Sequence, residues 1–247
     1  MAGHSKFKNI QFRKGAQDKK RGVLFAKISK EITVAAKLGS PDPDINARLR
    51  SAVQSAKAAS FPKENIERAI KKSTDKNLEN YEEVRYEGFG PGGTAIIVEG
   101  LTDNRNRTAS NVRTSFNKFG GALGESGSVS HLFNHYGFVK FKKEISSEDD
   151  FFSFSIESGA DDCFFEEDNY EAVCEPNQLS SFYNTMENHF GEPESSGFQW
   201  RSQNLINVSG DKAKSLFNLL DDLENDEDVQ QVFSNFEVAE DDLENLL

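Results

Sequence analysis

Apolar residues recur every three or four positions along three successive stretches between residues 19 and 72, which predicts three helices. Gly39-Ser40-Pro41 ends the first stretch, Asp42-Pro43 is expected to cap the second, and Phe61-Pro62 opens the third. Because the connections are short, we expect an antiparallel three-helix bundle. The predicted inward-facing residues are Leu24, Ile28, Ile32, Ala35, Leu49, Val53, Ala56, Ile66, Ala69 and Ile70.

After a polar linker at residues 73–80, the apolar pattern changes from a helical to an alternating period. Val84 and Tyr86 alternate with charged residues, residues 90–93 form a glycine-rich turn, and residues 94–101 are mostly β-branched and apolar. This pattern predicts a β-hairpin. A helix at 108–119 and a strand at 128–133 are expected next, and together these elements give the order ββαβ.

The pattern of residues 138–201 predicts the element order βαββαβ, which is the ferredoxin-like arrangement. A strand, a helix and a strand in residues 205–236 would complete the earlier ββαβ unit, so the ferredoxin-like segment is expected to be an insertion. The expected elements within it are strands at 138–141, near Cys163, at 170–174 and at 198–201, and helices at 147–158 and 177–190.

The predicted fold class is therefore α+β and multidomain: an N-terminal three-helix bundle followed by two α+β domains, the last ferredoxin-like and inserted in the second. The expected boundaries are 1–80 for a basic arm and bundle, 81–137 plus 202–247 for the second domain, and 138–201 for the inserted domain. A chain of 247 residues fits two or three domains of ordinary size.

Charge is divided unevenly along the chain. Residues 1–80 hold 18 Lys and Arg against 8 Asp and Glu, a formal charge of +10, whereas the other 167 residues hold 11 against 33, a charge of −22. Basic side chains bind polyanions through the release of counterions from phosphates, while an acidic body repels the same polyanion. The asymmetry therefore favours a nucleic-acid-binding N-terminal region, and the alternative is a helical domain that is merely rich in lysine.

Residues 1–22 interleave basic and aromatic side chains and cannot bury an apolar face of their own. Lysine and arginine neutralise phosphates, and aromatic rings stack on unpaired bases, so this arm is a candidate nucleic-acid-binding segment. An extended strap that docks on the bundle and leaves its lysines in solvent is an equally weighted interpretation. The candidate binding residues of the arm are His4, Lys6, Phe7, Lys8, Arg13, Lys14, Lys19, Lys20 and Arg21.

Residues 103–108 join a predicted strand to a predicted helix and contain Arg105 and Arg107. Backbone amides at a helix N-terminus and two arginines suit a phosphate, so both arginines are candidate nucleic-acid-binding residues. The alternative is a capping turn in which Asp103 or Asn106 accepts backbone amides and the arginines pair with nearby acids.

No pattern of catalytic residues is found in the sequence. His131 and His135 are expected on a strand and a turn, and the glycine-rich stretches at 90–93 and 120–128 lack the Lys-[Ser/Thr] ending of a phosphate-binding loop. We therefore expect a non-enzymatic protein without a metal site or cofactor. No apolar run is long enough to span a membrane and no secretory signal is present, so a cytoplasmic protein without a membrane partner is expected, with Cys163 and Cys174 as semi-buried thiols.

Seven motifs stand in order along nearly the whole chain: AGHSKFKNIQFRKGAQDKKRG from Ala2, KEITVAAKLG from Lys30, FPKENIERAIKK from Phe61, YEGFGPGG from Tyr86, LTDNRNRTASNVR from Leu101, GGALGESGSVSHLF from Gly120 and VSGDKAKSLFNLLDDLENDEDVQQVF from Val208. Together they resemble the YebC/PmpR family. The resemblance implies a cytoplasmic regulator of gene expression with three domains, the last inserted in the second. Phe7 stands where members of the family commonly have Trp, a change that preserves an aromatic ring.

Two function hypotheses follow. In the first, the protein is a nucleic-acid-binding regulator; bacterial family members are described as DNA-binding transcriptional regulators, and mitochondrial and some bacterial relatives as translational activators at the ribosome. In the second, it is an interaction module that binds protein partners through its acidic body. DNA, RNA or the ribosome as the target stays open, because no predicted helix stands out as a base-reading helix. The oligomeric state stays open as well.

Overall fold

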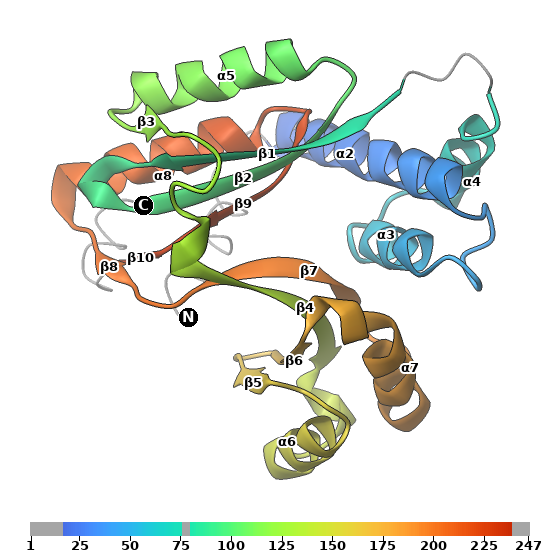
Figure 1. The fold of residues 1–247 in the computed structure, drawn as a ribbon. Helices are drawn as coiled ribbons and strands as arrows, with labels where there is room; N and C mark the ends of the chain where they lie inside the picture. The colour runs from blue at the N-terminus through green and yellow to red at the C-terminus, as the bar shows by residue number, and fades with distance from the viewer. Residues whose placement is uncertain (1–16, 76–79, 239–247) are drawn as a thin grey trace. The chain divides into compact units, whose positions relative to one another are not determined.

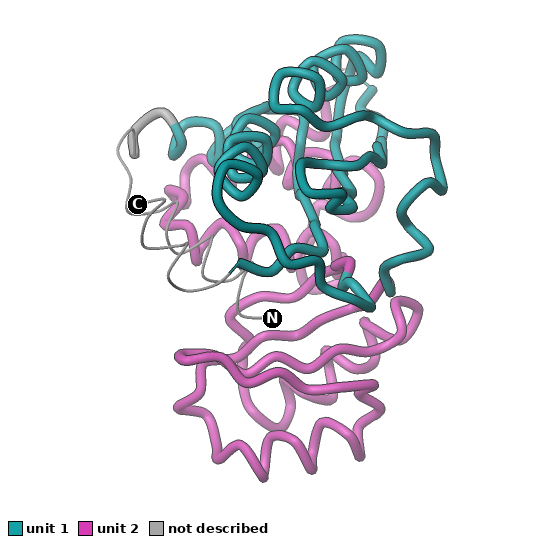
Figure 2. The backbone as a smooth tube through the Cα atoms, turned by 90° about the vertical axis from the view of Figure 1, so that its left-hand side faces the viewer, with its two compact units in different colours: residues 1–27, 79–134, 201–247 teal, residues 28–78, 135–200 magenta. Residues whose placement is uncertain are grey.

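The computed structural model describes residues 17–75 and 80–238 (Figure 1). By its internal packing the chain divides into two compact units (Figure 2). Unit 1 comprises residues 1–27, 79–134 and 201–247, and unit 2 comprises residues 28–78 and 135–200.

Three helices make up the described part of the N-terminal region: α2 (Gln17–Leu38), α3 (Ala47–Ala58) and α4 (Lys63–Lys72). They confirm the three helices predicted from the apolar spacing. The Thr33 hydroxyl on α2 lies 2.8 Å from the Ser29 carbonyl of its own helix and 3.1 Å from the Ala69 carbonyl on α4, so its single proton is shared and a buried polar contact joins the two helices. The most fully buried apolar side chains of these helices are Ile32, Leu49 and Ala56.

The start of α3 differs from the prediction. Asp42 and Pro43 lie in the turn before the helix, and the N-cap is Asn46, whose side-chain oxygen accepts from the Leu49 amide at 3.1 Å. The Asn46 side-chain nitrogen also donates to the carbonyl of Ala35 in the last turn of α2, at 2.9 Å. A single amide side chain therefore caps α3 and binds the end of α2, which the Asp-Pro motif read locally does not reveal.

The first sheet lies in unit 1, and its described strands follow the order β3-β1-β2-β9. Strands β1 (Glu82–Phe89) and β2 (Ala95–Thr102) form the predicted antiparallel hairpin, with Glu82 opposite Thr102 and Phe89 opposite Ala95. Strand β9 (Val229–Ser234) pairs with the other edge of β2, and the short β3 (Ala122–Leu123) pairs with β1.

Helices α5 (Arg105–Lys118) and α8 (Gly210–Glu224) supply the core that covers one face of this sheet (Figure 1). Phe116 of α5 and Leu216 of α8 are fully buried with Ile96 of β2. Beyond this sheet, β8 (Ile206–Asn207) and β10 (Phe236–Glu237) form a small parallel pair.

The predicted strand at 128–133 is wrong. Residues Ser130–Leu132 form a single 3₁₀ turn, and the next strand, β4, begins at Phe133. The backbone amides of Val129 and Ser130 donate to the carboxylate of Glu87 instead of to a neighbouring strand, at 2.9 and 2.8 Å. The Glu87 carboxylate therefore accepts the backbone amides that the apolar pattern predicted to pair with a neighbouring strand.

The second sheet confirms the ferredoxin-like prediction. Its described elements follow the order βαββαβ, with strands arranged β5-β6-β4-β7. They lie between β3 and β8 in the chain, so this domain is inserted within the one that holds the first sheet. The elements are β4 (Phe133–Lys142), α6 (Glu148–Glu157), β5 (Asp162–Phe165), β6 (Asn169–Cys174), α7 (Leu179–Phe190) and β7 (Ser195–Ser202).

Unit 2 contains the ferredoxin-like elements together with most of the bundle. Within this unit, the Gln54 amide of α3 donates to the Tyr183 hydroxyl of α7 at 2.7 Å, and that hydroxyl donates to Glu187 at 3.0 Å. Burial raises the pKa of Tyr183 to about 12, so the phenol stays protonated and keeps both bonds at neutral pH. The boundaries expected at residues 80, 137 and 201 stay predictions, since the compact units group the chain differently.

Candidate nucleic-acid interface

Most of the predicted arm lies outside the described residues. This applies to His4, Lys6, Phe7, Lys8, Arg13 and Lys14, whose assignment to nucleic-acid binding stays a prediction. The described chain begins within the basic run, so the backbone of Lys19 is in the first turn of α2.

The first half of α2 is fixed to the end of α8 by its lysines. The ammonium group of Lys20 lies 2.7 Å from a carboxylate oxygen of Asp221, and the ammonium of Lys27 donates to the Glu224 carbonyl at 2.6 Å. Arg21 is exposed, with its guanidinium 5.1 Å from the centre of the Phe25 ring. Of these three cations, Arg21 is therefore the one whose charge faces solvent without a described carboxylate partner.

The turn before α5 is a capping turn held by its own side chains. Asn104 is the N-cap and accepts from the Arg107 amide at 3.1 Å, while the Thr102 hydroxyl accepts from the Asn104 amide at 2.9 Å. The sequence interpretation proposed Asp103 or Asn106 for this role, whereas the cap is Asn104, which lies between them. Capping by Asn104 explains why α5 begins at Arg105, three residues earlier than its apolar pattern indicated.

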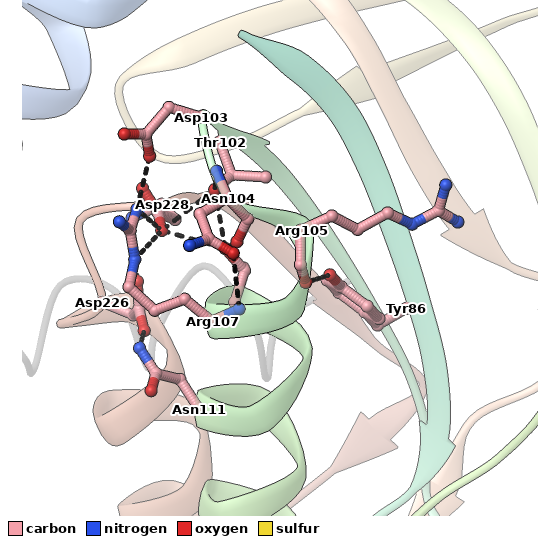
Figure 3. Close-up of polar contacts among 10 residues, drawn as sticks. Tyr86, Thr102, Asp103, Asn104, Arg105, Arg107, Asn111, Asp226 and Asp228 are labelled. Atoms are coloured by element: carbon pink, nitrogen blue, oxygen red, sulfur yellow. Dashed lines mark hydrogen bonds and ion pairs between the residues drawn. The ribbon is translucent and has the colours of Figure 1, made fainter.

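Arg107 is bound by two carboxylates (Figure 3). Its guanidinium lies 2.6 Å from an oxygen of Asp103 and 2.6 Å from an oxygen of Asp228, and the second carboxylate is buried. These hydrogen bonds, first to Asp228 and then to Asp103, raise the pKa of Arg107 further above its usual range. A phosphate would have to displace both carboxylates, so the geometry favours the capping alternative for this residue.

Asp228 connects the turn to the sheet. Its carboxylate accepts from the Thr108 hydroxyl at 2.9 Å and from the Thr102 hydroxyl at 3.2 Å, and its carbonyl accepts from the Leu101 amide at 2.7 Å. The register of β2 and β9 shifts next to this point, between Glu99 and Gly100. The sequence interpretation missed Asp228, because its partner Arg107 lies 121 positions away and no local motif joins them.

Arg105 differs from its neighbour. Its side chain extends away from the Arg107–Asp228 cluster and is exposed (Figure 3), and within the described ranges no carboxylate lies within ion-pair distance of it. Its backbone carbonyl accepts from the Tyr86 hydroxyl at 3.2 Å. Arg105 is therefore a single solvent-facing arginine at this turn, and its assignment to nucleic-acid binding stays a prediction.

Backbone amides of the glycine-rich segment at 124–130 donate to the carboxylate of Glu87. The side chain of Glu87 is 1% exposed, and burial alone would raise its pKa, but amides of Val129, Gly127 and Ser130 donate to the carboxylate and hold the pKa below its usual range. An internal anion therefore occupies amides that a phosphate-binding loop would offer to a ligand. This agrees with the absence of the Lys-[Ser/Thr] ending that a phosphate-binding loop would have.

Helix α4 carries further exposed cations of the described N-terminal region. Arg68, Lys71 and Lys72 are exposed, and no described carboxylate lies within ion-pair distance of them, whereas Lys63 lies 3.8 Å from Glu67 in the same helix. The sequence interpretation omitted all three from the candidate site. The charge pattern of the helix, basic toward its C-terminus, is the signal that could have included them.

The described residues form neither a metal site nor a reactive thiol. No group of three His, Cys, Asp or Glu side chains among them is placed to hold a metal ion. Both cysteines are buried free thiols, and burial raises the pKa of Cys174 to about 12, so its reactive thiolate is scarce at neutral pH. No helix in the described ranges is both long and apolar enough to cross a membrane.

Comparisons with known proteins agree with this architecture. Residues 5–76 match the model of the TACO1/YebC protein N-terminal domain, and residues 81–236 match that of the TACO1/YebC second and third domain. A conserved hypothetical protein from Aquifex aeolicus, known from its crystal structure, is 42% identical over 90% of this chain and 92% of its own, with a TM-score of 0.80. The chain belongs to the TACO1/YebC family. The model of the second and third domains is named for transcriptional regulation, so at the family level a regulator-like function is indicated.

Proposed function

We propose that the protein is a non-enzymatic nucleic-acid-binding regulator of gene expression that binds through its basic first 80 residues. The observation that carries this proposal is the division of charge, +10 in residues 1–80 against −22 in the rest. Phosphate neutralisation needs cations that are not already paired, and Arg21, Arg68, Lys71 and Lys72 meet that condition among the described residues.

A DNA-binding transcriptional regulator is the preferred form of this proposal, because the family model over residues 81–236 is named for transcriptional regulation. The second form is a ribosome-associated translation factor that binds RNA. Phe7 and Phe12 favour it, since they are interleaved with the basic residues of the arm and aromatic rings stack on unpaired bases. Both forms share the N-terminal region as the binding surface.

Binding of the full chain to labelled duplex DNA and to labelled single-stranded RNA, followed by fluorescence anisotropy over a salt series, tests the proposal. We expect affinity to fall steeply with salt, with a log–log slope of about 0.9 per neutralised phosphate on duplex and about 0.7 on single strands. No binding to either probe at low salt would refute the proposal.

Phe7→Ala separates the two forms. If the RNA form is correct, this change weakens binding to single-stranded RNA more than binding to duplex DNA, because a stacked base contributes about 1–3 kcal/mol. Phe89→Ala, which removes a 42% exposed ring from β1, is the matched control and should alter neither affinity. In cells, the DNA form predicts sedimentation with the chromosome and the RNA form predicts sedimentation with ribosomes.

A further inference from the structure

Helix α6 of the ferredoxin-like domain presents an apolar stripe to solvent. Phe152 is 46% exposed and Ile156, one turn later, is 41% exposed, whereas Phe151 and Ser155 on the other side of the helix are fully buried. Phe165 on the neighbouring strand β5 is 38% exposed and packs edge-on against Phe151 at 6.2 Å. The helix is therefore anchored from its inner side, and Phe152 and Ile156 are available to a partner.

Acidic residues flank this stripe at both ends of the helix. Asp149 shares the outward face of α6 with Phe152 and Ile156 by helical spacing, and Glu148, Asp150 and Glu157 are exposed beside it. Over residues 138–201 the domain holds fifteen Asp and Glu against four Lys and Arg, a formal charge of −11. An exposed aromatic and aliphatic pair flanked by acidic residues is the pattern of a partner surface with a charged rim.

The negative charge of the acidic residues beside the stripe indicates which kind of partner can bind there. Nucleic acid and anionic lipid surfaces would be repelled. A second copy docked on the same face around a two-fold axis would set one acidic rim against another, which costs free energy. A cationic protein segment gains attraction from the rim and burial of its apolar side chains from the stripe.

We propose that the outer face of α6, formed by Phe152 and Ile156 with their flanking acidic residues, docks a basic peptide segment of a partner protein that carries apolar anchor residues. This surface does not depend on nucleic-acid binding by the N-terminal region. It gives the acidic inserted domain a role of its own, in which charge steers the encounter and the two apolar side chains hold the bound segment.

Fluorescence anisotropy of a labelled synthetic peptide with two leucines at i and i+4, flanked by lysine and arginine, tests the proposal on the full chain. We expect the double variant Phe152→Ser with Ile156→Ser to lower affinity by about tenfold or more, as for central apolar anchors. A peptide with both leucines replaced by serine should lose a similar factor. Phe198→Ser, which changes another side chain that is 46% exposed in the same domain, is the matched control and should bind like the wild type.

A neutralised variant, Asp149→Asn with Glu157→Gln, should bind the peptide more slowly and with a weaker dependence on salt. Because all these residues are exposed, the thermal midpoint of each variant should stay near that of the wild type. The proposal is overturned if the double variant binds the peptide like the wild type, if the wild type does not bind it, or if the double variant changes self-association or RNA binding instead.

Discussion

The cations at the start of α5 and those on α4 differ in what surrounds them. Arg107 is held by Asp103 and by the buried carboxylate of Asp228, and its neighbours Thr102 and Thr108 bind the same carboxylate. Arg68, Lys71 and Lys72 are exposed, with no described carboxylate within ion-pair distance. At the start of α5 the positive charge stabilises the fold, whereas the positive charges on α4 are available to a polyanion. Basic residues alone therefore do not mark a binding site, because their partners decide which role they have.

The largest expected effect is the loss of stability on Asp228→Ala. This change leaves Arg107 and Thr108 without their shared acceptor at the point where the sheet register shifts. We expect the free energy of unfolding to fall by about 2–3 kcal/mol, below the cost for a fully buried pair because the Arg107 side chain is 47% exposed. Denaturant unfolding measures it, with Glu125→Ala, which removes an exposed carboxylate from the same compact unit, as the control. Equal effects of the two changes would show that the cluster does not stabilise the fold.

Neutralising the exposed cations of α4 should weaken nucleic-acid binding and leave stability nearly unchanged. The triple variant Arg68→Gln, Lys71→Gln and Lys72→Gln is expected to weaken nucleic-acid binding about tenfold and to lower the salt slope on duplex by about 0.9 for each lost phosphate contact. Its stability should change by less than about 1 kcal/mol, since exposed charges at a helix C-terminus contribute little. Anisotropy and unfolding on the same samples measure both quantities, and Arg107→Gln should show the reverse pattern. Unchanged affinity and salt slope in the triple variant would assign these cations to solvated surface.

A smaller effect is expected at Glu87, a buried carboxylate that accepts backbone amides and lies 3.5 Å from the Arg85 guanidinium. Glu87→Gln should lower stability by about 1 kcal/mol, because a neutral amide is a weaker acceptor for the amides of Val129 and Ser130. The folded pKa of Glu87 lies below the unfolded value, so its contribution is complete above the unfolded pKa and is lost as the pH falls through the folded pKa. Unfolding curves of both proteins from neutral to acidic pH should therefore converge in acid. A difference that does not change with pH would contradict this role for the carboxylate.

Local periodicity was sufficient for most of the fold. The hairpin of β1 and β2, the three N-terminal helices and the βαββαβ order were all predicted, because their apolar residues recur with the period of the element. The failures share one cause, a side chain that binds distant or neighbouring backbone: Asn46 caps α3 in place of Asp42, and Glu87 takes the amides of the predicted strand at 128–133.

The candidate site was less predictable than the fold. Sequence patterns grouped Arg105 with Arg107, but the structure separates them, because the partner of Arg107 comes from the turn before β9. Charge patterning identified the basic N-terminal region as a whole without separating paired cations such as Lys20 from unpaired ones such as Arg21. Ion pairing between residues far apart in the chain is a property of the folded state, so it is absent from any local pattern.

The most direct test of the central claim is a comparison of two charge reversals in the full chain. One variant changes Lys6, Lys8, Arg13 and Lys14 to Glu in the arm, and the other changes Arg113, Lys142, Lys212 and Lys214, four exposed cations of the acidic body, to Glu. Both alter the net charge equally, and anisotropy against duplex DNA and single-stranded RNA over a salt series measures their affinities. The account predicts that the arm variant loses most of its binding and salt dependence while the body variant retains most of both. Equal losses in the two variants, or binding by the arm variant at the wild-type level, would contradict it.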